Sequence, residues 1–159
     1  MTPAPAPLAA RIVATWFGSG LVPKAPGTAG SLAALPVAWA ILAWGGGWPG
    51  LALAVLAAVV AGLWATAEVL RASGIKDPSF VVVDEVAGQW IALLPAGLDP
   101  ILFAAGFVLF RLFDIWKPWP VGWADRELPG AFGVMVDDLL AGAYAAAGVY
   151  GLNLAMGGT

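Results

Sequence analysis

The sequence contains no cysteine and no histidine. Without cysteine, the chain has no disulfide, no thiolate nucleophile and no cysteine-ligated zinc. Without histidine, it has neither an imidazole base nor the commonest protein ligand for transition metals. Any catalysis by this chain must therefore depend on carboxylates, lysine, arginine, hydroxyl groups, backbone amides or a hard metal ion.

Charged residues are also scarce. Of the 159 residues, 11% are charged and 61% are hydrophobic, and the mean hydropathy is +0.88. A soluble domain is roughly 45–50% apolar and about 25% charged, so the composition indicates one integral membrane domain. The net charge of -3 offers no basic surface for a nucleic acid, and we expect no nucleic-acid partner.

Long apolar segments alternate with short polar or glycine-rich connections. This pattern predicts an all-α fold, an integral membrane bundle of about five apolar helices. The expected helices are residues 31–44, 51–70, 80–94, 100–117 and 130–154, with a short amphipathic helix over residues 8–17. Residues 1–10 are expected to form a disordered tail, followed by a single helical membrane domain over residues 11–156.

The basic residues are distributed unevenly along this expected bundle. They lie before the first apolar helix, between the second and third, and between the fourth and fifth. The other connections, residues 45–50 and 95–100, contain no lysine or arginine. Because basic loops remain on the cytoplasmic side, all these residues are expected at the cytoplasmic face of the membrane.

Carboxylates from three segments are expected at this same face. Asp84 and Glu85 begin the third helix, Asp114 ends the fourth, and Asp137 and Asp138 lie near the start of the fifth. Clustered carboxylates suit Mg²⁺ or Mn²⁺, which would also offset their mutual repulsion. The alternative is that these acids only stabilise helix starts, which fits Asp137 and Asp138 less well because they follow an apolar stretch.

A mixed-charge cluster lies where the fourth helix ends. Arg111, Asp114 and Lys117 recur at every third residue, so they lie along one side of the helix, and Pro118 ends it. Such charges usually face a bundle interior or a polar cavity. Interfacial anchoring by the long basic side chains is the alternative, although anchoring does not require Asp114.

Residues 26–31 form a loop of turn-forming and small hydroxyl residues before the first apolar helix. Its backbone amides, with Thr28 and Ser31, are suited to an anion at a helix start, although an ordinary turn and cap fits the same residues. The bases that could contact phosphate are Lys24, Arg111, Lys117 and Arg126. Arg126 fits a solvated surface pair equally well. Together these groups suggest phosphoryl chemistry on an anionic lipid head group.

Four blocks of this sequence carry a resemblance to a known family. They are Trp16–Leu32, Val83–Trp90, Phe110–Pro120, and Met135–Asp138 with Ala141-Gly142. The chain resembles the phosphatidylglycerophosphatase A family, and Phe-Arg-x-Phe-Asp-Ile-x-Lys-Pro is its most specific block. The resemblance implies Mg²⁺-dependent hydrolysis of the terminal phosphate of phosphatidylglycerophosphate to phosphatidylglycerol, in phospholipid biosynthesis. It also implies a bacterial inner-membrane enzyme whose active site faces the cytoplasm.

Under this resemblance, each candidate residue has an expected role. The metal ligands would be Asp84, Glu85, Asp137 and Asp138. The catalytic residues would be Asp84, Asp114 and Lys117. The substrate phosphate would be bound by Lys24, Thr28, Ser31, Arg111, Lys117 and Arg126. Two nucleophiles are compatible with this set: a water activated by the metal, and Asp114 itself, since Arg111 and Lys117 flank it.

Three other functions are compatible with parts of this sequence. A membrane transporter or channel could use the acids as an ion site, but an ion path should place acids at several membrane depths. A structural membrane subunit leaves the mixed charges between Arg111 and Lys117 unexplained. A lipid phosphotransferase of the CDP-alcohol type lacks its Asp-Gly-x-x-Ala-Arg signature here. The sequence predicts no oligomeric state.

Overall fold

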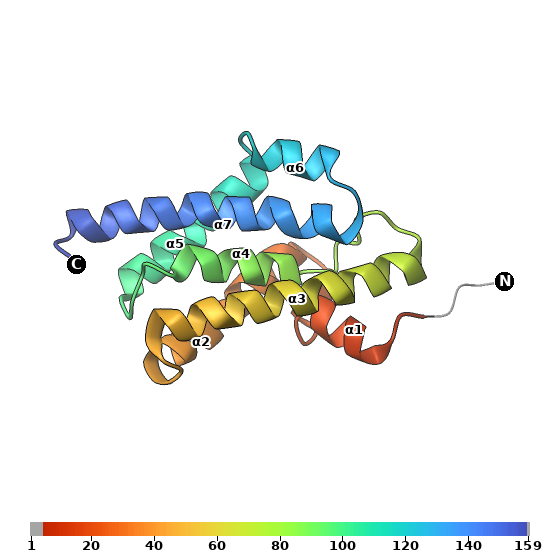
Figure 1. The fold of residues 1–159 in the computed structure, drawn as a ribbon, viewed down its shortest axis with the longest axis horizontal. Helices are drawn as coiled ribbons and strands as arrows, with labels where there is room; N and C mark the ends of the chain where they lie inside the picture. The colour runs from red at the N-terminus through yellow and green to blue at the C-terminus, as the bar shows by residue number, and fades with distance from the viewer. Residues whose placement is uncertain (1–4, 159) are drawn as a thin grey trace.

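The computed structural model describes residues 5–158, and all the regular structure in this range is helical. The elements are α1 (Leu8–Ala14), the 3₁₀ turn η1 (Ser19–Leu21), α2 (Pro26–Trp44), α3 (Gly47–Ser73), α4 (Val83–Leu93), α5 (Pro100–Trp116), α6 (Val121–Glu127) and α7 (Gly130–Ala155). The long helices run roughly along the long axis of the molecule, with α1 and the end of α7 at opposite ends (Figure 1). The all-α prediction is confirmed.

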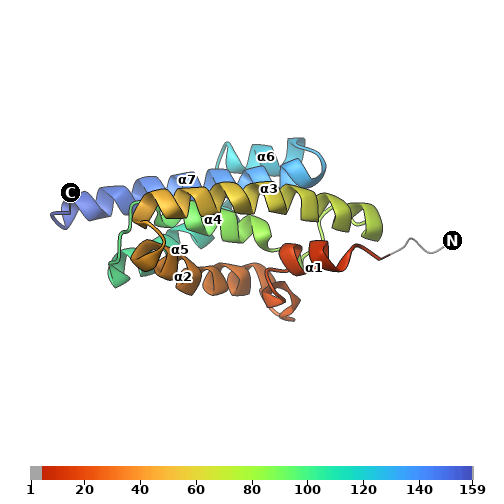
Figure 2. The ribbon, with the colours of Figure 1, turned by 60° about the horizontal axis from the view of Figure 1, so that its bottom comes forward.

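The short helix α4 forms the centre of the bundle. It packs against α2, α3, α5 and α7, and Figure 2 shows it between α3 and α2. Nine of its eleven residues are buried. The Trp90 indole N–H donates to the carbonyl of Ala34 at 3.0 Å, which ties α4 to α2.

Glycines allow α4 and α7 to approach closely. A Cβ at Gly142 of α7 would collide with the carbonyl of Gly88 of α4. A Cβ at Gly88 would lie 2.5 Å from the carbonyl oxygen of Asp138. Because both positions lack a side chain, the backbone of α7 around Asp138 lies directly against α4.

Within residues 5–158, three helices are long and apolar enough to cross a membrane, so the expectation of five is wrong. The three candidates are α2, α3 and α7, with 19, 27 and 26 residues. With 11 and 17 residues, α4 and α5 rise about 16 Å and about 26 Å. A membrane span needs about 20 apolar residues, a length that α2 nearly reaches and that α4 and α5 do not. The apolar character of α4 instead reflects its burial by protein on all sides.

Three helix starts also differ from expectation, and one of them is that of α3, which begins at Gly47 rather than at residue 51. α2 begins at Pro26 rather than at residue 31, since the fixed φ of proline suits the first turn of a helix. α4 begins at Val83 rather than at residue 80. Residues 1–4 of the expected disordered tail lie outside the described residues, while Leu8–Ala14 already form α1 and Ala10 is fully buried.

Candidate active site

A polar cavity of about 280 Å³ lies where several helices begin or end. The starts of α2, α4 and α7, the end of α5, part of α6 and the α3–α4 connection all contribute to its wall. Ten charged residues line it: Lys76, Asp77, Asp84, Glu85, Arg111, Asp114, Lys117, Asp125, Asp137 and Asp138. The structure therefore brings together acids and bases from distant parts of the chain on one side of the bundle.

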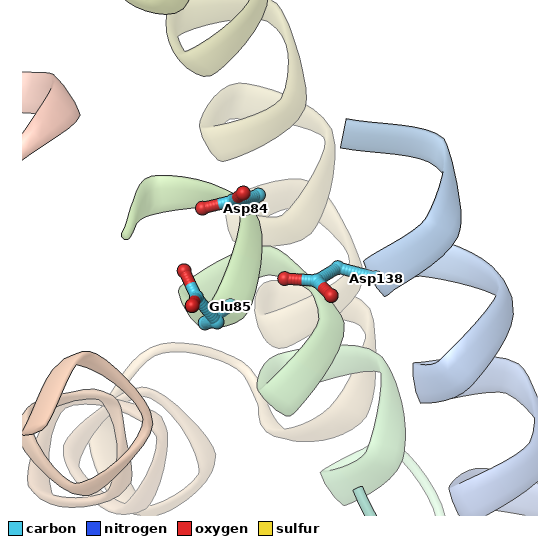
Figure 3. Close-up of side chains that lie close together, drawn as sticks. All are labelled: Asp84, Glu85 and Asp138. Atoms are coloured by element: carbon cyan, nitrogen blue, oxygen red, sulfur yellow. The ribbon is translucent and has the colours of Figure 1, made fainter. Parts of the chain in front are cut away.

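Three of the carboxylates converge closely. One oxygen each from Asp84, Glu85 and Asp138 lies within 4.8 Å of the other two. Figure 3 shows the side chain of Asp138 reaching from α7 toward α4, where Asp84 and Glu85 begin the helix. The first turn of α4 favours negative charge, and the glycine contact between α4 and α7 brings the third acid close. We call Asp84, Glu85 and Asp138 the three-acid cluster.

The electrostatics of this cluster favour binding of a cation. Burial raises the pKa of Asp84 well above its ordinary value, and the neighbouring charge of Glu85 adds to the rise. Burial also raises the pKa of Glu85. In the described part of the chain, Asp84 Oδ1 and Glu85 Oε2 are buried without a hydrogen-bond partner. A divalent cation held by these hard oxygen atoms would satisfy them and keep both acids ionised, so the residues fit Mg²⁺.

Two basic side chains in the cavity are paired with acids. The Arg111 guanidinium lies 2.5 Å from Asp114 one turn along α5. Lys117 Nζ contacts Asp125 at 2.6 Å and Asp137 at 2.8 Å. Burial alone would lower the pKa of Lys117, but its contacts with these two carboxylates raise the pKa overall. Lys117 therefore stays protonated near neutral pH, and Asp137 contacts this lysine rather than joining the three-acid cluster.

Gly27, in the first turn of α2, lies directly against the acids and bases of the cavity. A Cβ at this position would collide with the carboxylate of Glu85 and lie 3.2 Å from the guanidinium of Arg111. A glycine is therefore needed for α2 to cover these two side chains. Within the segment 26–31, Pro26 and Gly27 line the cavity, whereas the hydroxyl residues do not.

Four of the expected phosphate-binding residues do not line the cavity: Lys24, Thr28, Ser31 and Arg126. The Ser31 hydroxyl is buried and donates to the carbonyl of Gly27 at 3.0 Å within its own helix. Lys24 is exposed before α2, and Arg126 is exposed on α6. Successive helical residues point about 100° apart, so only one side of the first turn of α2 can face the cavity, and Thr28 and Ser31 are not on it.

Sequence reasoning did not select four polar residues that do line the cavity. They are Lys76, Asp77 and Ser79 in the α3–α4 connection, and Asp125 in α6. Their polarity was visible in the sequence, but a connection gives no periodic signal to show which way it folds. The contact of Asp125 with Lys117 could not be predicted either, because it depends on how the chain turns between α5 and α6.

A family model and several curated proteins relate this chain to known proteins. The family model for phosphatidylglycerophosphatase A matches residues 12–153. The phosphatidylglycerophosphatase A of Escherichia coli K12 is 41% identical over 142 residues, covering 88% of this chain and 81% of that protein. The phosphatidylglycerophosphatase A of Haemophilus influenzae is 36% identical, covering 90% and 88%. A putative phosphatidylinositol-3-phosphatase of Bacteroides thetaiotaomicron is 43% identical, covering 84% and 86%. No solved structure matches.

Proposed function

The chain belongs to the phosphatidylglycerophosphatase A family, and we propose that it removes the terminal phosphate of phosphatidylglycerophosphate in a Mg²⁺-dependent reaction. Membership makes it a phosphatidylglycerophosphatase, an enzyme that hydrolyses a phosphoric monoester. The single observation that supports the metal dependence is the three-acid cluster, with two buried oxygen atoms that lack a partner among the described residues.

Asp84, Glu85 and Asp138 are the residues that would hold the ion. A bound divalent cation would draw electron density from the phosphate and offset part of its negative charge. We assign a different role to Asp137, the fourth expected ligand. Its contact with Lys117 at 2.8 Å holds that ammonium group at the cavity, where it can bind a phosphate oxygen.

Arg111 and Lys117 bind the terminal phosphate in this proposal. The Arg111 Nε is buried and has no hydrogen-bond acceptor among the described residues, so this donor remains available to a phosphate oxygen. Lys117 has three donors, and its two observed acceptors leave one donor free. Both side chains supply charge-assisted hydrogen bonds, which are stronger than neutral ones.

Asp114 is the residue that we place at the reacting bond. A water oxygen bonds to phosphorus while a proton of that water passes to the Asp114 carboxylate. The bond between phosphorus and the glycerol oxygen breaks, and this oxygen takes a proton from solvent. The other sequence-based hypothesis, direct attack by Asp114, predicts a phosphorylated enzyme that hydroxylamine would cleave. Rapid quenching during turnover distinguishes the two routes.

We propose that the enzyme lies in the bacterial inner membrane with the cavity facing the cytoplasm. The three long apolar helices fit a membrane enzyme. All seven basic residues precede α2 or lie in segments associated with the cavity end of the bundle, and the positive-inside rule assigns such a side to the cytoplasm. The gathering of the acids in one cavity also favours an enzyme over a transporter, whose acids should follow a path across the membrane.

The experiment is an assay of phosphate release by the purified protein in neutral detergent. We expect release from phosphatidylglycerophosphate with Mg²⁺ and loss of release in EDTA, restored when Mg²⁺ is added back. Phosphatidylinositol 3-phosphate, tested in parallel, examines the activity suggested by the name of the Bacteroides relative. No release from phosphatidylglycerophosphate with any divalent ion would reject the proposed function, and undiminished release in EDTA would reject the metal.

A further inference from the structure

The cavity has an excess of negative charge that an anionic substrate must overcome. Seven of the ten charged residues that line it are acids and three are bases: Lys76, Arg111 and Lys117. A divalent ion in the three-acid cluster would offset part of this excess. The proposed substrate, however, carries two phosphate groups, one at the terminus and one in the diester that joins glycerol to the diacylglycerol. Each of them requires a favourable partner.

Two of the three bases are already neutralised by acids. Arg111 pairs with Asp114, and the side chains are only 16% and 12% exposed. Lys117 is held between Asp125 and Asp137. Both bases therefore lie at fixed positions inside the cavity, where we have placed the terminal phosphate.

Lys76 differs from both. It belongs to the connection between α3 and α4, it is exposed, and it lines the same cavity. Within residues 5–158, it forms no ion pair with any carboxylate. Its ammonium group is a mobile point charge on a four-carbon stem, so it can reach an anion at the cavity mouth without first breaking an existing contact.

We propose that Lys76 binds the diester phosphate of the lipid and so favours substrates that have this phosphate as well as a terminal one. In such a lipid the diester lies between the terminal phosphate and the diacylglycerol. When the terminal phosphate is inside the cavity, the diester must lie nearer its mouth, where exposed Lys76 is available. This inference depends on the proposed function, because it requires a substrate that has both phosphates.

The experiment compares Lys76→Ala with wild type, using the two reaction products as competitive inhibitors of phosphatidylglycerophosphate hydrolysis. Phosphatidylglycerol retains the diester and lacks the terminal phosphate, whereas inorganic phosphate resembles only the terminal group. We expect the inhibition constant of phosphatidylglycerol to rise about tenfold, as for loss of one charge-assisted hydrogen bond. The inhibition constant of inorganic phosphate should not change. In Lys76→Ala, KM for phosphatidylglycerophosphate should rise with little change in kcat. Lys76→Arg should restore KM and the inhibition constant of phosphatidylglycerol to their wild-type values.

Arg71→Ala is the matched control, because Arg71 lies in the last turn of α3, pairs with Glu68 and does not line the cavity. It removes one surface positive charge and should leave both inhibition constants unchanged. Equal weakening of both inhibitors in Lys76→Ala, or no weakening of phosphatidylglycerol, would overturn the assignment to Lys76. A wild-type enzyme that releases no phosphate from phosphatidylglycerophosphate would instead reject the proposed function itself.

Discussion

The two ends of the bundle both contain a cavity, but the cavities differ in chemistry. The cavity far from the three-acid cluster is larger, about 570 Å³ against about 280 Å³. Its wall includes Trp48, Tyr150 and Asn153, and its one charged residue is Asp99. Asp99 accepts hydrogen bonds from the amides of Ile101 and Leu102 at 2.7 and 3.1 Å, so it caps α5.

The comparison shows that volume alone does not indicate a site in this protein. At the far end the acid is satisfied by the backbone of its own helix. In the smaller cavity, buried oxygen atoms of Asp84, Glu85 and Asp137 have no hydrogen-bond partner among the described residues. Such groups are costly unless a ligand or ion satisfies them. The unsatisfied carboxylate oxygens in this cavity therefore make this end of the bundle the candidate functional end.

The largest effect should come from Asp138→Asn, which removes one carboxylate from the three-acid cluster. Activity should fall by roughly 10³-fold or more, because charge stabilisation at the phosphate depends on this set. The thermal unfolding midpoint without added metal should stay equal or rise, since one of several mutually repelling buried charges is removed. A large loss of thermal stability would instead indicate that Asp138 is a structural residue.

Lys117→Ala should have the next largest effect. We expect kcat/KM to fall about 10²-fold, because a charged contact with the phosphate is lost. The variant also leaves the buried Asp137 without its partner, so Lys117→Arg is needed as a charge-preserving comparison. Activity measured on both variants tests whether charge is the main requirement. If Lys117→Ala and Lys117→Arg lost activity equally, the reaction would require the position of the ammonium group and not its charge alone.

Gly88→Ala should reduce activity and stability together by separating α4 from α7. The added methyl group would lie 2.5 Å from the Asp138 carbonyl and 2.6 Å from the Phe110 ring. Overpacking of this kind costs about 1–3 kcal/mol, and we expect roughly a tenfold loss of activity because the three-acid cluster spans these two helices.

Gly151→Ala is the matched control for this substitution. Gly151 lies in the same helix α7, nearer its C-terminal end, and a Cβ there would meet no atom within 4 Å. Activity should be unchanged and stability equal or slightly higher, because alanine favours a helix by about 1 kcal/mol over glycine. Loss of activity in Gly151→Ala would show that the two ends of the bundle are coupled.

The sequence predicted the gathering of the acids better than it predicted the number of membrane helices. Lysine and arginine avoid the lipid interior, so their positions indicated which helix ends would meet. The convergence of Asp84, Glu85 and Asp138 follows from that argument. The number of membrane helices did not follow, because an apolar run such as residues 80–94 looks the same whether lipid or protein surrounds it. Burial of α4 by four helices is a tertiary property.

Individual contacts were beyond sequence reasoning for a related reason. Asp137 and Asp138 are adjacent, and both were expected to bind metal. The helical turn between them directs Asp138 toward α4 and brings Asp137 to Lys117. Ser31 likewise looked like an anion ligand, but inside α2 its hydroxyl bonds to Gly27. These outcomes depend on the rotation of each helix about its axis, which the spacing of residues in one segment does not determine.

The smallest effect should come from Asp99→Ala at the far end, and it tests the comparison most directly. Loss of the two cap hydrogen bonds should cost about 1 kcal/mol and lower the unfolding midpoint by roughly 2–4 °C for a chain of this length. Asp99→Asn should retain most of that stability, because asparagine is also a good cap. Neither change should alter kcat, KM or the Mg²⁺ requirement in the phosphate-release assay. If Asp99→Ala impaired hydrolysis while its unfolding midpoint stayed within that range, the far cavity would have to contribute to catalysis. Unsatisfied carboxylates would then no longer be enough to choose between the two ends.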